Sequence, residues 1–174
     1  MSVLAAHALK LFLIDRKSNL QLKIIELDRK LSDLQQYSSC IGDETFSMQD
    51  MMNVPSSVFQ RAMAFMNYSQ NGAFQGAQMN MQMMGPQIQA QMAQMQAQAQ
   101  SNPNAIEQYK NWIFQNLFKQ ELSKYQKHET KLLNQQEKEI QKEKANISAQ
   151  IQIIDQQMST ADQQTKEGIQ SMKA

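Results

Sequence analysis

Apolar residues recur every seven positions at both ends of the chain. In residues 1–46, one series of Leu and Ile has this spacing, and a second series lies four positions further along. Together they form a heptad seam, the a and d positions through which one helix packs along another. The seam residues are Leu13, Leu20, Ile24, Leu27, Leu31 and Leu34. We expect a helix that ends near Gly42 and enters a bundle, because Leu9, Phe12, Leu22 and Ile25 broaden the seam beyond a two-stranded contact.

Residues 104–174 predict a longer helix with a heptad pattern of its own. Asn104 is expected to cap it, with Glu107 closing a capping box. The apolar phase shifts by one position at Leu132 and Leu133, which is a stutter and relaxes a supercoil locally. This phase shift leaves open whether the helix is continuous or folds back. The seam residues after the shift are Leu133, Ile140, Ile147, Ile151, Ile154 and Met158.

The centre of the chain, residues 47–103, has almost no charge. Asp50 and Arg61 are its only charged residues, and 11 of the 14 methionines fall between Met48 and Met95. Gln-rich polar tracts often stay disordered, but apolar residues here step by three or four positions, which favours helix. An ordered helical centre and a partly disordered one both remain open. The stepping residues are Met81, Met84, Ile88, Met92 and Met95.

Two groups in the sequence are candidate interfaces. The methionine stripe either fills an irregular core or forms an adaptable surface, because Met side chains are flexible. Trp112, Phe114 and Phe118 cover more than one face of their helix. They therefore predict either a core where several helices converge or a contact with another copy, another protein or, less favoured, a membrane surface.

The sequence contains no pattern that carries catalysis or ligand binding. His7 and His128 lie far apart and outside metal-binding spacings, and no phosphate-binding loop or nucleophile motif is present. We expect no enzyme activity, cofactor, metal or small-molecule ligand. Nucleic-acid binding is not expected either, because the densest lysine run, residues 138–144, alternates with glutamates. The single cysteine, Cys40, excludes an internal disulfide.

Val3–Ile14 is mostly apolar, but Lys10 interrupts it and no basic residue precedes it, unlike a signal peptide. We expect a soluble protein, cytoplasmic or exported without a cleavable leader. The predicted fold is all-α, an elongated hairpin or bundle with coiled-coil terminal arms and a Met/Gln-rich helical centre. The hypothesis for function is a structural protein that self-assembles into a homo-oligomer or filament. The alternative is an adaptor or chaperone that binds hydrophobic segments of helical partners through its methionines.

Overall fold

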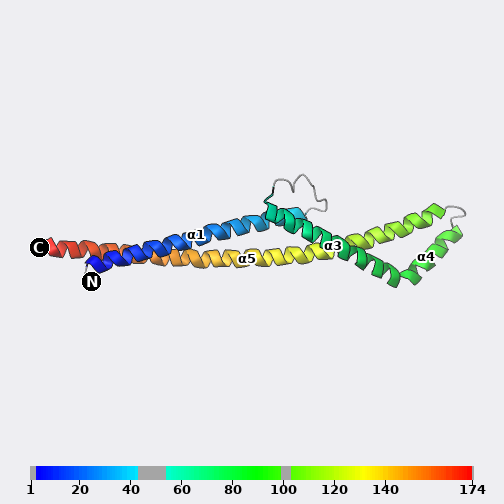
Figure 1. Ribbon diagram of the computed structural model, residues 1–174. Helices are drawn as coiled ribbons and strands as arrows, with labels where there is room; N and C mark the ends of the chain where they lie inside the picture. The colour runs from blue at the N-terminus through cyan, green and yellow to red at the C-terminus, as the bar shows by residue number, and fades with distance from the viewer. Residues whose placement is uncertain (1–2, 43–53, 99–102, 174) are drawn as a thin grey trace. The chain divides into compact units, whose positions relative to one another are not determined.

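The computed structural model describes residues 3–42, 54–98 and 103–173, and these residues form four helices (Figure 1). The helices are α1 (Val3–Gly42), α3 (Ser56–Met83), α4 (Gly85–Gln98) and α5 (Pro103–Lys173). No strand occurs within the described ranges. The all-α prediction is therefore confirmed, and the Met/Gln-rich segment is helical over Ser56–Met83 and Gly85–Gln98.

The helix boundaries agree with most of the local signals. Pro55 precedes α3, and its carbonyl oxygen accepts the first bond from the backbone N–H of Phe59 at 3.0 Å. Gly85 begins α4, as a Gly-Pro pair favours. The predicted cap at Asn104 is wrong, because α5 already begins at Pro103. Proline suits the first helical position, where its missing N–H costs no hydrogen bond.

Helix α5 is a single helix of 71 residues, about 105 Å long at 1.5 Å per residue. The stutter at Leu132 and Leu133 does not interrupt it. The chain divides into two compact units, and α5 contributes to both. Unit 1 contains residues 1–35 and 134–174, and unit 2 contains residues 36–133. Unit 1 thus combines parts of the sequence segments 1–46 and 104–174, and unit 2 combines segment 47–103 with the adjoining parts of the other two.

In unit 1, α1 lies beside the second half of α5, and ion pairs define one antiparallel register (Figure 1). Lys10 bonds to Asp162 at 2.7 Å and Lys17 to Asp155 at 2.6 Å, so seven residues forward on α1 match seven residues back on α5. A third pair, Asp28 with Lys144, continues the register with the charges exchanged between the helices. The charges of the two arms therefore neutralise each other across the pair.

A fourth pair in unit 1 is more exposed. Lys23 and Glu143 lie 2.8 Å apart. Their hydrogen bond and mutual attraction raise the pKa of Lys23 and lower the pKa of Glu143. Exposed pairs of this kind add little stability individually, so the ion pairs select the register while apolar burial supplies the driving force.

All predicted seam residues are buried or half-buried in the structure. On α1 the most enclosed are Leu13 and Leu27, and on α5 they are Leu133, Ile147 and Ile154. The remaining seam residues, all half-buried, are Leu20, Ile24, Leu31, Leu34, Ile140, Ile151 and Met158.

The prediction of a broader seam on α1 is wrong within this chain. Leu9, Phe12, Leu22 and Ile25 are all exposed. They lie outside the narrow strip that a single neighbouring helix covers, and unit 1 pairs α1 only with α5.

In unit 2, small residues on α3 allow a close approach to the first half of α5. The buried face of α3 is formed by Val58, Ala62, Ser69, Ala73 and Ala77. A Cβ atom added to Gly72 would clash with Oη of Tyr125, and one added to Gly76 would lie 3.0 Å from Cγ of Glu121. These contacts are shorter than normal side-chain packing allows, so the helix spacing here depends on the glycines.

Candidate interaction surfaces

The first half of α1 has more apolar residues than its contact with α5 can cover. Leu13 is buried, but large side chains on the other sides of the helix remain exposed, Leu11 by 57% and Phe12 by 61%. A helix that is apolar all round is normally buried on all sides. We call these residues the α1 surface: Leu4, Leu9, Leu11, Phe12, Ile14, Leu22 and Ile25.

The predicted methionine stripe lies mostly against the chain itself. Ile88 is buried, Met81 and Met92 are half-buried, and Met84 lies at the exposed junction of α3 and α4. Met95 lies in α4, but its side chain falls outside the described residues. The stripe therefore fills a core at Ile88, as one sequence interpretation predicts. At Met84 it lies at the surface, as the other predicts.

The predicted aromatic group is divided in the same way. Phe114 is half-buried and meets Phe74 of α3 edge to face, with ring centroids 5.5 Å apart. Phe118 is also half-buried. Trp112 is 60% exposed and stacks on Tyr109, whose hydroxyl donates a 2.6 Å hydrogen bond to Gln91 of α4. The group therefore helps to join α3, α4 and α5 while leaving the indole ring at the surface.

Several exposed residues of unit 2 were not among the sequence candidates. Tyr68, Phe74, Met79 and Met83 all lie on α3, and Met83 is 67% exposed. We group these residues with Met84 and Trp112, which are also exposed, and call the group the central surface. The chain has no charged residue from Ala62 to Ile106, so the α3 part of this surface carries no charge. The absence of charge in the sequence could have indicated an apolar surface in this region, but it does not identify which residues face outward.

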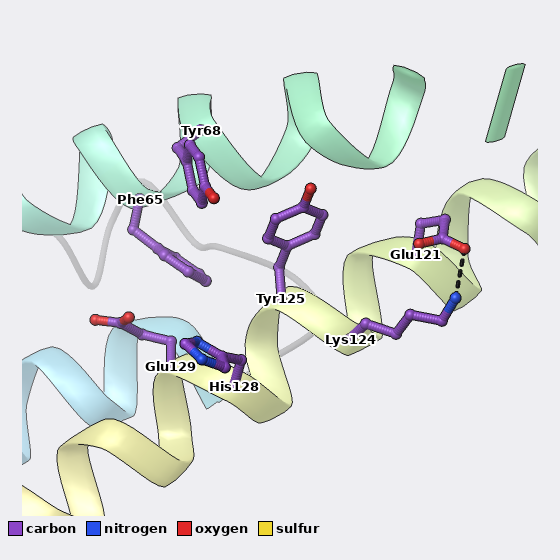
Figure 2. Close-up of a pocket in the computed structure, with 7 residues that line it drawn as sticks. All are labelled: Phe65, Tyr68, Glu121, Lys124, Tyr125, His128 and Glu129. Atoms are coloured by element: carbon purple, nitrogen blue, oxygen red, sulfur yellow. Dashed lines mark hydrogen bonds and ion pairs between the residues drawn. The ribbon is translucent and has the colours of Figure 1, made fainter. Parts of the chain in front are cut away.

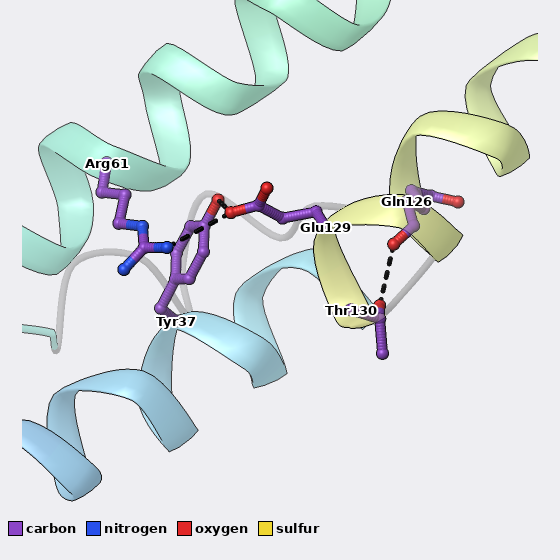
Figure 3. Close-up of polar contacts among 5 residues, drawn as sticks. All are labelled: Tyr37, Arg61, Gln126, Glu129 and Thr130. Carbon is purple, nitrogen blue, oxygen red and sulfur yellow. Dashed lines mark hydrogen bonds and ion pairs between the residues drawn. The ribbon is translucent and has the colours of Figure 1, made fainter. Parts of the chain in front are cut away.

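Arg61 is held in a cluster that joins three helical segments (Figure 3). Its guanidinium group lies over the ring of Tyr37, 4.3 Å from the centroid, and bonds to Glu129 Oε1 at 3.3 Å. The Tyr37 hydroxyl donates to the same oxygen at 2.9 Å. The cluster thus ties the end of α1 to α3 and α5, and burial is the main reason that the pKa of Tyr37 is raised, followed by its bond to Glu129.

The two histidines lie in different units. His7 and His128 are both exposed, on α1 and α5 respectively. Among the described residues, no group of His, Cys, Asp and Glu is arranged to hold a metal ion. None of the described helices contains a stretch with the length and hydropathy that crossing a bilayer requires.

No family model, curated protein or solved structure matches the chain.

Proposed function

We propose that this protein is a structural subunit that self-assembles through surfaces its own fold leaves apolar. The α1 surface carries this proposal. Leu11 and Ile25 lie fourteen residues apart, so they fall on one line of the heptad, on the exposed side of α1 away from the strip that contacts α5. A second copy that covered this line would remove side chains from water that are now more than half exposed.

The central surface supports extended assembly. It lies in unit 2, whereas the α1 surface lies in unit 1. Two different surfaces on one subunit can form head-to-tail contacts, which produce rings or filaments. Gln and Met side chains around the central surface let neighbouring copies approach without charge repulsion.

We propose further that α1 and the second half of α5 pair as an antiparallel coiled coil. The spacing of the least exposed residues supports this. On both helices, they alternate at intervals of three and four residues, which is the spacing of coiled-coil a and d positions.

The self-assembly proposal predicts particles whose size grows with concentration in a purified sample. Light scattering would measure the size, and negative-stain microscopy would show whether the particles are rings or filaments. The emission of Trp112 gives a second readout, because this exposed residue is the only tryptophan. A shift to shorter wavelength with concentration would place the central surface in the contact, whereas a monomer at all concentrations would refute self-assembly.

A matched pair of double variants tests the α1 surface. Leu11→Glu with Ile25→Glu should reduce the association constant by about a hundredfold or more, because both charges would lose water at the interface. Asn19→Glu with Gln35→Glu adds the same charge at exposed positions of the same helix and should change association little. Equal behaviour of the two variants would exclude this surface, provided that circular dichroism shows unchanged helicity.

The adaptor alternative rests on three exposed methionines near the end of α3, Met79, Met83 and Met84. Flexible thioether side chains can adapt to partners of different shape. This function predicts a particle of constant size that binds an unrelated amphipathic peptide. Met79→Glu with Met83→Glu should abolish peptide binding, whereas Gln60→Glu with Gln70→Glu, at exposed positions elsewhere on α3, should not.

A further inference from the structure

A cavity of about 390 Å³ opens between α3 and α5 in unit 2 (Figure 2). Three aromatic rings line it, those of Phe65 and Tyr68 from α3 and that of Tyr125 from α5. Tyr68 and Tyr125 meet nearly at right angles, with an interplanar angle of 89° and ring centroids 5.4 Å apart. The Tyr125 ring lies over Gly72, where the side chain of any other residue would clash with it.

Two carboxylates line the same cavity, and each is fixed through one oxygen only. Glu129 Oε1 accepts from Tyr37 and Arg61. Glu121 Oε1 accepts from Asn80 at 2.9 Å and from Lys124 at 2.6 Å. Among the described residues, no hydrogen bond reaches Oε2 of either glutamate, so both retain an acceptor. Each carboxylate is also paired with one cation, Glu121 with Lys124 and Glu129 with Arg61, so the cavity offers free carboxylate acceptors and not a net charge.

One cationic side chain of unit 2 is already held between an aromatic ring and a carboxylate. Arg61 sits between the Tyr37 ring and Glu129 Oε1. The cavity combines three more rings with the same carboxylate, and its one lining cation, Lys124, bonds instead to Glu121 (Figure 2). A cation over an aromatic face is attracted by the ring quadrupole, most strongly when it is poorly hydrated.

We propose that this cavity binds an alkylated ammonium group, such as the trimethylammonium of choline or of a trimethylated lysine. Such a group carries a positive charge inside an apolar shell, which matches rings and carboxylates together. Anions are disfavoured by Glu121 and Glu129. This site does not depend on self-assembly.

The proposal is tested by titrating the full-length chain with choline and with its neutral isostere 3,3-dimethylbutan-1-ol. Chemical shifts of the tyrosine ring protons and calorimetry would measure both affinities. Choline should bind about tenfold more tightly or better, because only the charged compound gains the cation–π attraction. Equal affinities, or no binding of choline, would overturn the proposal.

Two tyrosine variants locate the site. Tyr68→Leu removes one ring of the cavity, and its side chain is already 65% exposed, so folding should be preserved. The affinity for choline should fall about tenfold. Tyr109→Leu, which changes a ring outside the cavity, should leave the affinity unchanged. Unchanged binding by the Tyr68 variant, or an equal loss in both, would place the bound choline elsewhere and contradict the proposal.

A last comparison identifies the source of the ligand. A short peptide with trimethyllysine and the same peptide with unmodified lysine would be titrated beside choline. Tighter binding of the trimethylated peptide indicates a protein segment, and preference for choline over both peptides indicates a small molecule or headgroup. Preference for unmodified lysine would overturn the proposal, because it would show recognition by hydrogen bonding instead of by the rings.

Discussion

The same helix, α5, is paired by two different means in the two units. In unit 1, branched aliphatic residues are buried against α1 while regularly spaced Lys–Asp pairs define the register. In unit 2, α3 approaches through Gly72 and Gly76, and rings interlock across the contact. Charge pairs on the surface tolerate changes of size, whereas a close approach at glycine does not. In unit 2 the position of α3 against α5 therefore depends on close packing, whereas in unit 1 the register of α1 against α5 depends on ion pairs.

The largest effect should follow from charging the buried strip of unit 1. Ile147 and Ile154 are only 4% and 3% exposed. Ile147→Glu should lower the free energy of unfolding by about 3 to 5 kcal/mol, because a carboxylate would be buried without a partner. The double variant with Ile154→Glu should abolish cooperative unfolding of unit 1 in a urea titration followed by circular dichroism.

The matched control is Ile153→Glu, the neighbouring residue, which is 54% exposed. Its effect should stay within about 0.5 kcal/mol, as for most surface substitutions. If Ile147→Glu proved equally harmless, the coiled-coil proposal and its heptad phase would have to be abandoned.

The shape-dependent contact of unit 2 should be sensitive to a single methyl group. Gly72→Ala should destabilise unit 2 by about 1 to 2 kcal/mol, because the steric cost against Tyr125 exceeds the gain in helix propensity. Gly85→Ala is the control, since nothing lies within 4 Å of its added Cβ. Denaturation should show this second variant as stable as the native chain or slightly more so. The reverse order of stabilities would contradict close packing at Gly72.

The Tyr37 cluster should make unit 2 sensitive to alkali. The pKa of Tyr37 is raised above its ordinary value of 10.0, so the folded state holds this proton more tightly than the unfolded state. The stabilisation that the raised pKa of Tyr37 gives to the folded state is complete below pH 10 and is lost as the pH rises further. We expect the free energy of unfolding to fall more steeply above pH 10 in the native chain than in Tyr37→Phe.

The comparison with Tyr37→Phe removes the effect of Lys23, whose pKa is also raised and which both proteins retain. Absorbance of phenolate at increasing pH should show one of the four tyrosines ionising later than the rest. Late ionisation that persisted in Tyr37→Phe would assign it to another residue.

The smallest effect should come from the register of unit 1. Lys17→Asp alone should cost about 0.5 kcal/mol, and combining it with Asp155→Lys should restore most of this loss. The recovery should shrink in 1 M salt, where exposed charges are screened. Absence of any coupling in low salt, measured as a double-mutant cycle, would show that this pair does not help to select the register.

Much of the fold follows from periodicity in the sequence. The heptads around Leu27 and Ile147 predicted which residues of the two arms are enclosed, because a seven-residue repeat places them on one side of a helix. The Gly85–Pro86 pair suits a helix start and lies at the beginning of α4. The end of α3 was less predictable, since Asn71 and Gly72 resemble a helix end but lie inside the helix, where Gly72 accommodates Tyr125.

The surfaces and the cavity depend on contacts between distant residues, which periodicity does not contain. Leu22 and Ile25 resembled seam residues and are exposed, because only one helix covers α1 in unit 1. Arg61 was visible as an isolated charge, but its partners Tyr37 and Glu129 lie on other helices. The aromatic cavity requires residues more than fifty positions apart to meet.

Pairing of the first helix with the last has a consequence for synthesis. Lys10 and Asp162 are separated by 152 positions, whereas unit 2 is one uninterrupted segment that can fold as soon as residue 133 has emerged. At 5 to 20 residues per second, the ribosome takes roughly 5 to 20 seconds to translate the sequence between the two helical segments of unit 1. During that interval α1 has no intramolecular partner, and its aliphatic strip stays open to chaperones or to α1 of a neighbouring nascent chain.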